Sequence, residues 1–213
     1  MAFFYYTDIE TEYLKKKDKR LGAVIDQLGH LKREVFDDLF EALVYSIVGQ
    51  QVSTKAQVTS WNRIRAHYGT VTPDAVAAAG PDALRSLGIS GRKAGYILDA
   101  AQKIRTGELN LDALRSKSDA VVERELCALN GIGVWTAQML MTFCMQRKNI
   151  MSFGDYGIRK GLRMLYHHRE IDQKLFDKYY RRYSPYATVA SLYLWEIAGG
   201  AIPEMRDFAP KRK

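Results

Sequence analysis

The chain has 213 residues, 47% of them hydrophobic and 26% charged, which is ordinary for a globular protein with one core or two closely packed halves. Its formal net charge of +8 indicates a polyanionic partner such as nucleic acid, or else a solvated basic surface. Two cysteines, Cys127 and Cys144, are too few for a structural zinc site or a four-cysteine iron–sulfur cluster, and we expect free thiols in a reducing compartment.

The N-terminal segment carries acidic residues and does not resemble a signal peptide, and no apolar stretch is long enough to span a bilayer. We therefore expect a cytoplasmic protein.

Helical periodicity dominates the first half of the chain. Apolar residues recur at helical spacing from Asp18 to Leu28, and a strongly amphipathic pattern from Asp37 to Gly49 predicts a central buried helix. Gly49-Gln50-Gln51-Val52-Ser53 ends this helix, and Ser53 is expected to cap the next one. Further helices are predicted to start at Pro73 and Pro81 and to run from about 92 to 104.

The second half continues with helices. One helix, capped by Ser118 or Asp119, leads into a Gly131-Ile132-Gly133 turn. The stretch from Trp135 to Met145 is apolar on nearly all sides, which predicts a deeply buried helix. Asp155, Asp172 and Ser184-Pro185 are expected to open the last three helices. Without any alternating strand pattern or internal repeat, the sequence predicts an all-α fold.

Two features in residues 129–156 carry chemistry. A Gly-x-Gly turn between helices exposes backbone N–H groups that can hold a phosphate, although a plain interhelical turn has the same pattern. Asp155 follows at the start of a helix, where the helix dipole favours a negative charge. From sequence alone Asp155 is either a simple helix cap or a catalytic carboxylate.

Three stretches resemble the helix-hairpin-helix DNA glycosylases that carry a catalytic aspartate. The similarity is greatest to the bacterial 3-methyladenine DNA glycosylase II branch and covers roughly residues 18 to 200. The matching residues are Leu129, Gly131, Ile132, Gly133, Trp135, Thr136 and Ala137 with Asp155-Tyr156; Phe40 to Ser53; and Tyr186 to Trp195.

The resemblance implies two packed α-helical subdomains, with the active site in the cleft between them. We expect residues 36–147 to form the central subdomain with the hairpin, and residues 1–35 with 148–213 to form the second. The expected partner is double-stranded DNA containing damaged bases, bound by a monomer associated with the nucleoid.

The resemblance also implies roles for individual residues. Asp155 would stabilise the positive charge that builds on the sugar during cleavage of the N-glycosidic bond. The hairpin residues Gly131, Ile132 and Gly133 would bind a DNA phosphate, and in the family a monovalent cation often helps them. Gln51, with Gln50 beside it, corresponds to the wedge that fills the gap left by the flipped base. The base pocket would be formed by Trp135, Met139, Tyr156 and Trp195, although for any one aromatic residue core packing is the simpler interpretation.

The reaction is predicted to be hydrolysis without strand cleavage. In the family, enzymes that also nick the backbone carry a lysine two positions after the second hairpin glycine, where this chain has Trp135. Lys93, followed by Asp112, resembles a second such hairpin, but we assign it to the scaffold, with the Lys93 side chain meeting solvent or a phosphate. The expected activity is release of alkylated purines of the 3-methyladenine or 7-methylguanine type. Action on deaminated or oxidised bases, or DNA binding without catalysis, are the alternatives.

Overall fold

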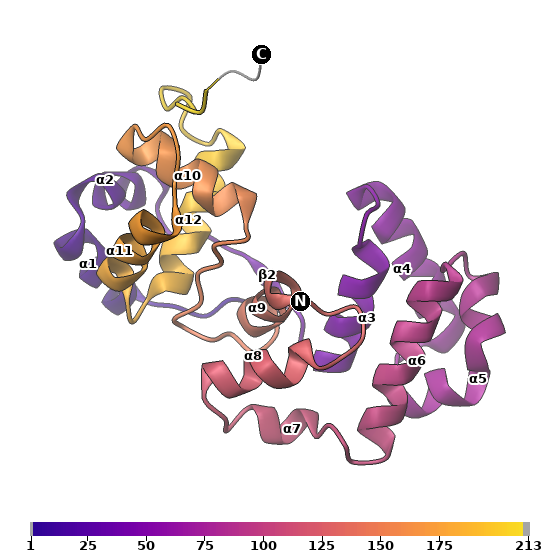
Figure 1. Cartoon of the computed structure of the whole chain (residues 1–213). Coiled ribbons are helices and arrows are strands. Elements are labelled where there is room, and N and C mark those ends of the chain that lie inside the picture. Colours follow the sequence, from indigo (N-terminus) through magenta and orange to yellow (C-terminus); the bar gives the residue numbers. More distant parts are fainter. Residues whose placement is uncertain (1, 211–213) are drawn as a thin grey trace. The chain divides into compact units, whose positions relative to one another are not determined.

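The structure, a computed structural model, describes residues 2–210 and is all-α, as the sequence predicts (Figure 1). Within this range there are twelve helices and one pair of two-residue strands, β1 (Ala2–Phe3) and β2 (Glu34–Val35). The chain divides into two compact units. Unit 1 comprises Met1–Val35 and Gln146–Lys213, and unit 2 comprises Phe36–Met145.

Unit 1 is built around its last helix. Almost the whole of α12 (Ala187–Gly199) is buried, and it contacts the other four helices of the unit. These are α1 (Asp8–Lys17), α2 (Lys19–Leu28), α10 (Tyr156–Tyr166) and α11 (Gln173–Tyr183). The hydrophobic face of each surrounding helix is thereby removed from water, which is the main source of stability for such a unit.

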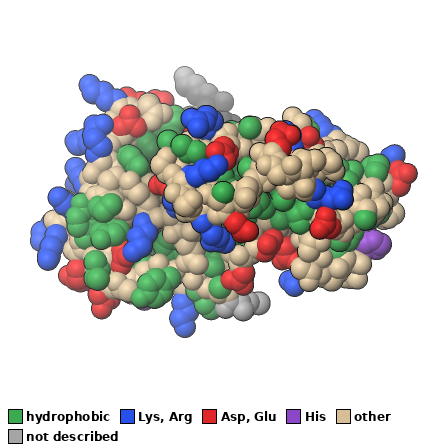
Figure 2. Space-filling model, turned by 90° about the horizontal axis from the view of Figure 1, so that it is seen from below, with side chains coloured by type: hydrophobic (Ala, Val, Ile, Leu, Met, Phe, Trp, Pro, Cys, Tyr) green, Lys and Arg blue, Asp and Glu red, His purple; other side chains and the backbone are tan. Residues whose placement is uncertain are grey.

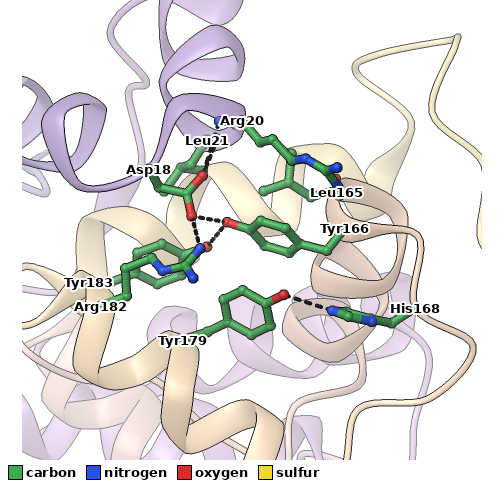
Figure 3. Close-up of polar contacts among 9 residues, drawn as sticks. All are labelled: Asp18, Arg20, Leu21, Leu165, Tyr166, His168, Tyr179, Arg182 and Tyr183. Carbon is green, nitrogen blue, oxygen red and sulfur yellow. Dashed lines mark hydrogen bonds and ion pairs between the residues drawn. The ribbon is translucent and has the colours of Figure 1, made fainter.

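A polar network ties α2, α10 and α11 together in unit 1 (Figure 3). Asp18 caps α2 and also accepts hydrogen bonds from Tyr166 of α10 and Arg182 of α11. Burial raises the pKa of Asp18, but the hydrogen bonds from Tyr166 and Arg182 outweigh it, so the pKa lies below its ordinary value. Beside this group, Tyr179 shares a hydrogen bond of 2.7 Å with His168. The buried carboxylate is thus paired and hydrogen-bonded, as a charge inside a core must be.

Unit 2 is organised around α3 (Leu39–Gly49), which contacts α4, α6 and α9. Most of its apolar side chains are buried, so α3 is the central buried helix that the sequence predicts. The remaining helices are α4 (Thr54–Tyr68), α5 (Pro73–Ser86), α6 (Gly91–Arg105), α7 (Leu111–Leu114), α8 (Asp119–Cys127) and α9 (Val134–Phe143). Helix α5 is broken at Gly80, where φ is 72°, so it consists of the two short segments that the prolines predict.

Three local predictions were wrong. Helix α1 was missed, although its Thr7–Glu10 capping box is a readable start signal. The β1–β2 pair was also missed, because it depends on a tertiary contact between Ala2–Phe3 and Glu34–Val35. Helix α9 is not buried throughout, since its first residues Val134 and Trp135 are 53% and 48% exposed.

On the face shown in Figure 2, Lys and Arg side chains are interspersed with Asp and Glu side chains. In the part of the chain that is described, no helix is long and apolar enough to cross a membrane.

Candidate functional site

The hairpin lies in unit 2, where the turn of residues 129–133 joins α8 to α9. Gly133 is the N-cap residue of α9, and because it has no side chain it leaves the helix start without a side-chain cap. The first N–H groups of a helix have no intrahelical acceptor. At the start of α9 both Gly131 and Gly133 are exposed, so a ligand can reach the backbone there. An uncapped helix start with the positive end of its dipole is suited to bind a phosphate.

Gly131 could not be replaced by a larger residue. Its φ of +82° is in the left-handed region, and an added Cβ would lie 2.3 Å from Cδ2 of Tyr96 in α6. Ile132, between the two glycines, is buried and anchors the turn in the core. The hairpin glycine is thus required both for the backbone conformation and for the packing of Tyr96.

A loop of residues 50–53, between α3 and α4, carries the two predicted wedge residues. We call it the extrusion loop. The Gln50 side chain donates a hydrogen bond of 2.7 Å from Nε2 to the carbonyl oxygen of Gly131. Gln51 is exposed, with a φ of 55°, which is uncommon for a residue other than glycine. The two glutamines therefore have different surroundings, one engaged with the hairpin and the other presented at the tip of the loop.

Two predicted pocket residues lie on α9 in the same unit. Trp135 is 48% exposed in the first turn, and Met139, one turn further along, is half-buried. A tryptophan that is half exposed on a helix start offers a flat apolar surface for a ligand, whereas a core tryptophan would not.

Asp155 lies in unit 1 and caps α10, as predicted. Its Oδ1 accepts hydrogen bonds of 2.9 Å from the Ile158 backbone N–H and of 2.9 Å from Nε1 of Trp195. The residue is only 8% exposed. The carboxylate is therefore held in one orientation by two donors from different helices and lies at the positive end of the α10 dipole.

Two glycines on α10, which sequence reasoning missed, allow this arrangement. A Cβ on Gly157 would lie 2.8 Å from Cδ1 of Trp195 and 3.1 Å from Oδ1 of Asp155. A Cβ on Gly161 would lie 2.3 Å from the carbonyl oxygen of Leu194. Glycines four residues apart share one helix face, so α10 and α12 approach closely along it. The Gly157-x-x-x-Gly161 spacing directly after Asp155 was the signal that could have found them.

Tyr156, the first residue of α10, is 64% exposed. The guanidinium of Arg163 lies over its ring, 5.6 Å from the centroid. Arg163 in turn makes two hydrogen bonds of 2.7 Å with the carboxylate of Asp207. The ring is thus supported from one side by a residue whose own position is fixed by a bidentate ion pair.

Lys93 and Asp112, the alternative hairpin pair, do not form a site. Lys93 lies in the first turn of α6 and Asp112 lies in α7, beyond the other end of a helix of 15 residues. Such a helix is about 22 Å long. The Lys93 Nζ donates a hydrogen bond of 2.8 Å to the carbonyl oxygen of Val48, which gives the side chain a contact in the scaffold. Its other N–H groups can still meet solvent or a phosphate, because Lys93 is only half-buried.

The described residues contain no group of three or more His, Cys, Asp or Glu side chains placed to hold a metal ion. A monovalent cation at the hairpin would bind backbone carbonyl oxygens instead. The carbonyl oxygens of Leu129 and Gly131 each accept a hydrogen bond, from Ile132 N–H and Gln50 Nε2. A carbonyl oxygen has two lone pairs, so both remain able to coordinate such an ion.

The α8–turn–α9 segment makes the chain a helix-hairpin-helix protein, with a buried helix-capping carboxylate in its other unit. Residues 44–184 match the HhH-GPD superfamily of base excision DNA repair proteins, and the chain belongs to that superfamily.

Named relatives agree with this assignment. DNA-3-methyladenine glycosylase 1 of Schizosaccharomyces pombe is 29% identical over 197 residues, covering 90% of this chain and 86% of the relative. DNA-3-methyladenine glycosylase 2 of Escherichia coli is 27% identical over 173 residues, covering 76% of this chain and 58% of the relative. The crystal structure of a DNA-3-methyladenine glycosidase from Bacillus halodurans is similar with a TM-score of 0.87 and 34% identity, covering 98% of this chain and 97% of that one.

Proposed function

We propose that the chain is a DNA glycosylase that hydrolyses the N-glycosidic bond of alkylated purines, of the 3-methyladenine or 7-methylguanine type, and leaves an abasic site. The observation that carries the proposal is Asp155, a buried carboxylate held by donors from two helices. The names of the relatives support alkylated purines as the substrate class. The proposed partner is double-stranded DNA with a damaged base. The protein would bind it as a monomer and act at the nucleoid in the cytoplasm.

The proposed chemistry follows from the charge of the transition state. Cleavage of the bond between base and sugar builds positive charge on the sugar, as in other glycoside hydrolysis. A carboxylate held beside the sugar stabilises that charge more than it stabilises the neutral ground state, which lowers the barrier. The two donors to Oδ1 keep the Asp155 carboxylate from rotating, so little reorganisation is needed as the charge develops.

Recognition of DNA is assigned to unit 2. The N–H groups at Gly131 and Gly133 would bind a phosphate of the backbone, with Ile132 between them, whose own N–H donates to the carbonyl oxygen of Leu129. Gln51, exposed at the tip of the extrusion loop, is proposed to fill the space of the extruded nucleotide. Gln50, the second wedge candidate, lies beside it and contacts Gly131 through its side-chain amide.

Aromatic surfaces would favour a cationic base. Trp135, Tyr156 and Trp195 offer rings, with Met139 as an apolar neighbour of Trp135 on α9. Stacking of a positively charged alkylated purine on such a ring contributes about 0.5–2 kcal/mol. Alkylation also weakens the glycosidic bond, so selectivity does not need to come from binding alone.

Strand cleavage is not part of the proposed reaction, because Trp135 takes the position of the lysine that would form a Schiff base. Borohydride should therefore trap no covalent adduct between the protein and DNA during turnover. Recovery of such an adduct would overturn the claim of hydrolysis alone, and mapping of the modified residue would then identify the amine.

The decisive experiment compares Asp155→Asn with wild type on duplexes carrying 3-methyladenine, 7-methylguanine, hypoxanthine, uracil or 8-oxoguanine. Asparagine keeps an oxygen that can cap α10 but loses the charge, so base release should fall about 10²- to 10³-fold while binding to abasic DNA persists. Asp172→Asn is the matched control, because Asp172 also caps a helix of unit 1 and has no proposed part in the chemistry.

The outcomes separate the alternatives. Release of hypoxanthine, uracil or 8-oxoguanine without release of methylated purines would change the substrate class to deaminated or oxidised bases. No release from any duplex, with DNA binding intact, would leave a non-catalytic DNA-binding protein. Wild-type activity in Asp155→Asn would remove the carboxylate from the mechanism.

A further inference from the structure

One helix of unit 2 supports both the extrusion loop and the hairpin turn. Lys93, Tyr96, Asp99 and Lys103 follow one another at spacings of three, three and four residues, so they lie on one face of α6. Each of these four side chains contacts the loop, the turn or the adjoining end of a helix.

The loop is tied to this face at its start. The Lys93 Nζ donates to the carbonyl oxygen of Val48 in the last turn of α3, at 2.8 Å. A cation at a helix C-terminus satisfies a carbonyl group that has no intrahelical partner and interacts favourably with the dipole. Burial, and then the neighbouring charge of Arg92, lower the pKa of Lys93. The end of α3, from which the loop emerges, is therefore fixed to α6.

The hairpin turn is tied to the same face by three further contacts. The ring of Tyr96 packs against Gly131 so closely that only a glycine fits there. Asn130 Nδ2 donates to Asp99 Oδ2 at 3.0 Å. Lys103 lies within 3.5 Å of the carbonyl oxygen of Ala128, at the end of α8.

Gln50 connects the extrusion loop directly to the hairpin turn, because its Nε2 donates a hydrogen bond of 2.7 Å to the carbonyl oxygen of Gly131. On the other side of the exposed tip, Ser53 caps α4. Gln51, whose φ of 55° is uncommon for a residue other than glycine, thus lies between Gln50 and Ser53, whose side chains are both hydrogen-bonded.

From these contacts we infer that Gln50 is a positioning residue, which together with α6 holds the extrusion loop at a fixed place relative to the phosphate-binding turn. Binding of a phosphate at the hairpin would then also set Gln51 against the base pair, so that binding energy is used to open the duplex. This inference rests on the proposed function and adds a residue that affects base extrusion and leaves the chemical step unchanged.

The test uses Gln50→Leu, which keeps much of the side-chain volume and removes the hydrogen bond. Single-turnover base release is measured on 7-methylguanine paired with cytosine, and on the same lesion in an unpaired bulge, where extrusion costs less. We expect a fall of about 3- to 10-fold on the paired lesion, the usual net effect of one hydrogen bond, and less than about 2-fold on the bulged one. Affinity for undamaged duplex should stay within about 2-fold, because the N–H groups of the turn remain.

Gln102→Leu is the matched control. It makes the same change on α6, at an exposed glutamine whose side chain contacts Arg105 and neither the loop nor the turn. Lys93→Met, which releases the start of the loop, is the second variant, and it should show the same preference for the bulged lesion. It also keeps the inference testable if Gln50→Leu does not fold.

Equal losses on paired and bulged lesions would overturn the inference, since a simple loss of folded protein affects both alike. Fluorescence of 2-aminopurine placed at the extruded position reports unstacking without any glycosylase activity. If wild-type protein releases no base but unstacks 2-aminopurine, the proposed function fails while the role of Gln50 is still measured. Unstacking by Gln50→Leu equal to that by wild type would refute the role of Gln50 independently.

Discussion

The hydrogen bond between Trp195 and Asp155 gives a sharp test of how the carboxylate is held. Trp195→Phe keeps an aromatic ring on α12 but removes the Nε1 donor, which lies 2.9 Å from Asp155 Oδ1. Oδ1 then retains the bond from the Ile158 backbone N–H. The carboxylate is left with one fewer constraint on its rotation.

The magnitude follows from the kind of bond that is lost. A hydrogen bond to a charged group contributes about 1.5–3 kcal/mol. Because the bond exists before and during the reaction, only the part that depends on carboxylate orientation affects the rate, so we take the lower end. A loss of about 1.4 kcal/mol corresponds to a tenfold decrease, and we expect kcat for 7-methylguanine release to fall about tenfold.

The assay is steady-state release of 7-methylguanine over a range of duplex concentrations, which gives kcat and KM, with binding to an abasic duplex measured in parallel. Phenylalanine is smaller than tryptophan, so lost stacking would also weaken binding of the base. Replacement of Trp195 by 3-benzothienylalanine, in which sulfur takes the place of the N–H group, is the matched control for shape. It should show the same fall in kcat with unchanged KM.

A wild-type kcat in the benzothienyl variant would refute the reasoning. It would mean that Trp195 acts only as a surface for the base. A rise in KM without any change in kcat in Trp195→Phe would point to the same conclusion.

The remaining predictions concern packing and acid stability. Gly157→Ala places a Cβ 2.8 Å from Cδ1 of Trp195, so kcat should fall at least as much as in Trp195→Phe. Measurement of base release checks this, and full activity would contradict the close packing of Gly157 against Trp195. Gly161→Ala meets the backbone of α12 at 2.3 Å and should lower the free energy of unfolding by about 1–3 kcal/mol, measured in urea. Burial raises the pKa of Glu10, but hydrogen bonds from Lys148 and Thr7 outweigh it and bring the pKa to about 2. A lowered carboxyl pKa stabilises the fold above the ordinary pKa of 4.5, and that contribution is lost as the pH falls towards about 2. Glu10→Gln should therefore weaken the dependence of the unfolding free energy on pH in that window, measured by urea unfolding at several pH values. An unchanged acid dependence in Glu10→Gln would assign the effect to other carboxylates.

Local sequence signals account for most of the fold. The apolar period of α3 and the capping aspartates Asp155 and Asp172 act within one or two turns of their own helix, so they can be read without any knowledge of neighbours. The left-handed residue in the hairpin is equally local, because glycine adopts that conformation at no steric cost.

By itself the sequence determined most of the helices, the hairpin and the position of Asp155 at a helix start. Only the tertiary structure decided what surrounds them. The Trp195 indole reaches Asp155 across 40 residues, and Gln50 reaches Gly131 across 81. Such pairs depend on the direction of side chains on packed helices, and that direction is set by close approaches such as the one at Gly161. Helix α9 illustrates the same limit, since an apolar sequence predicts burial but only packing determines that Trp135 stays exposed.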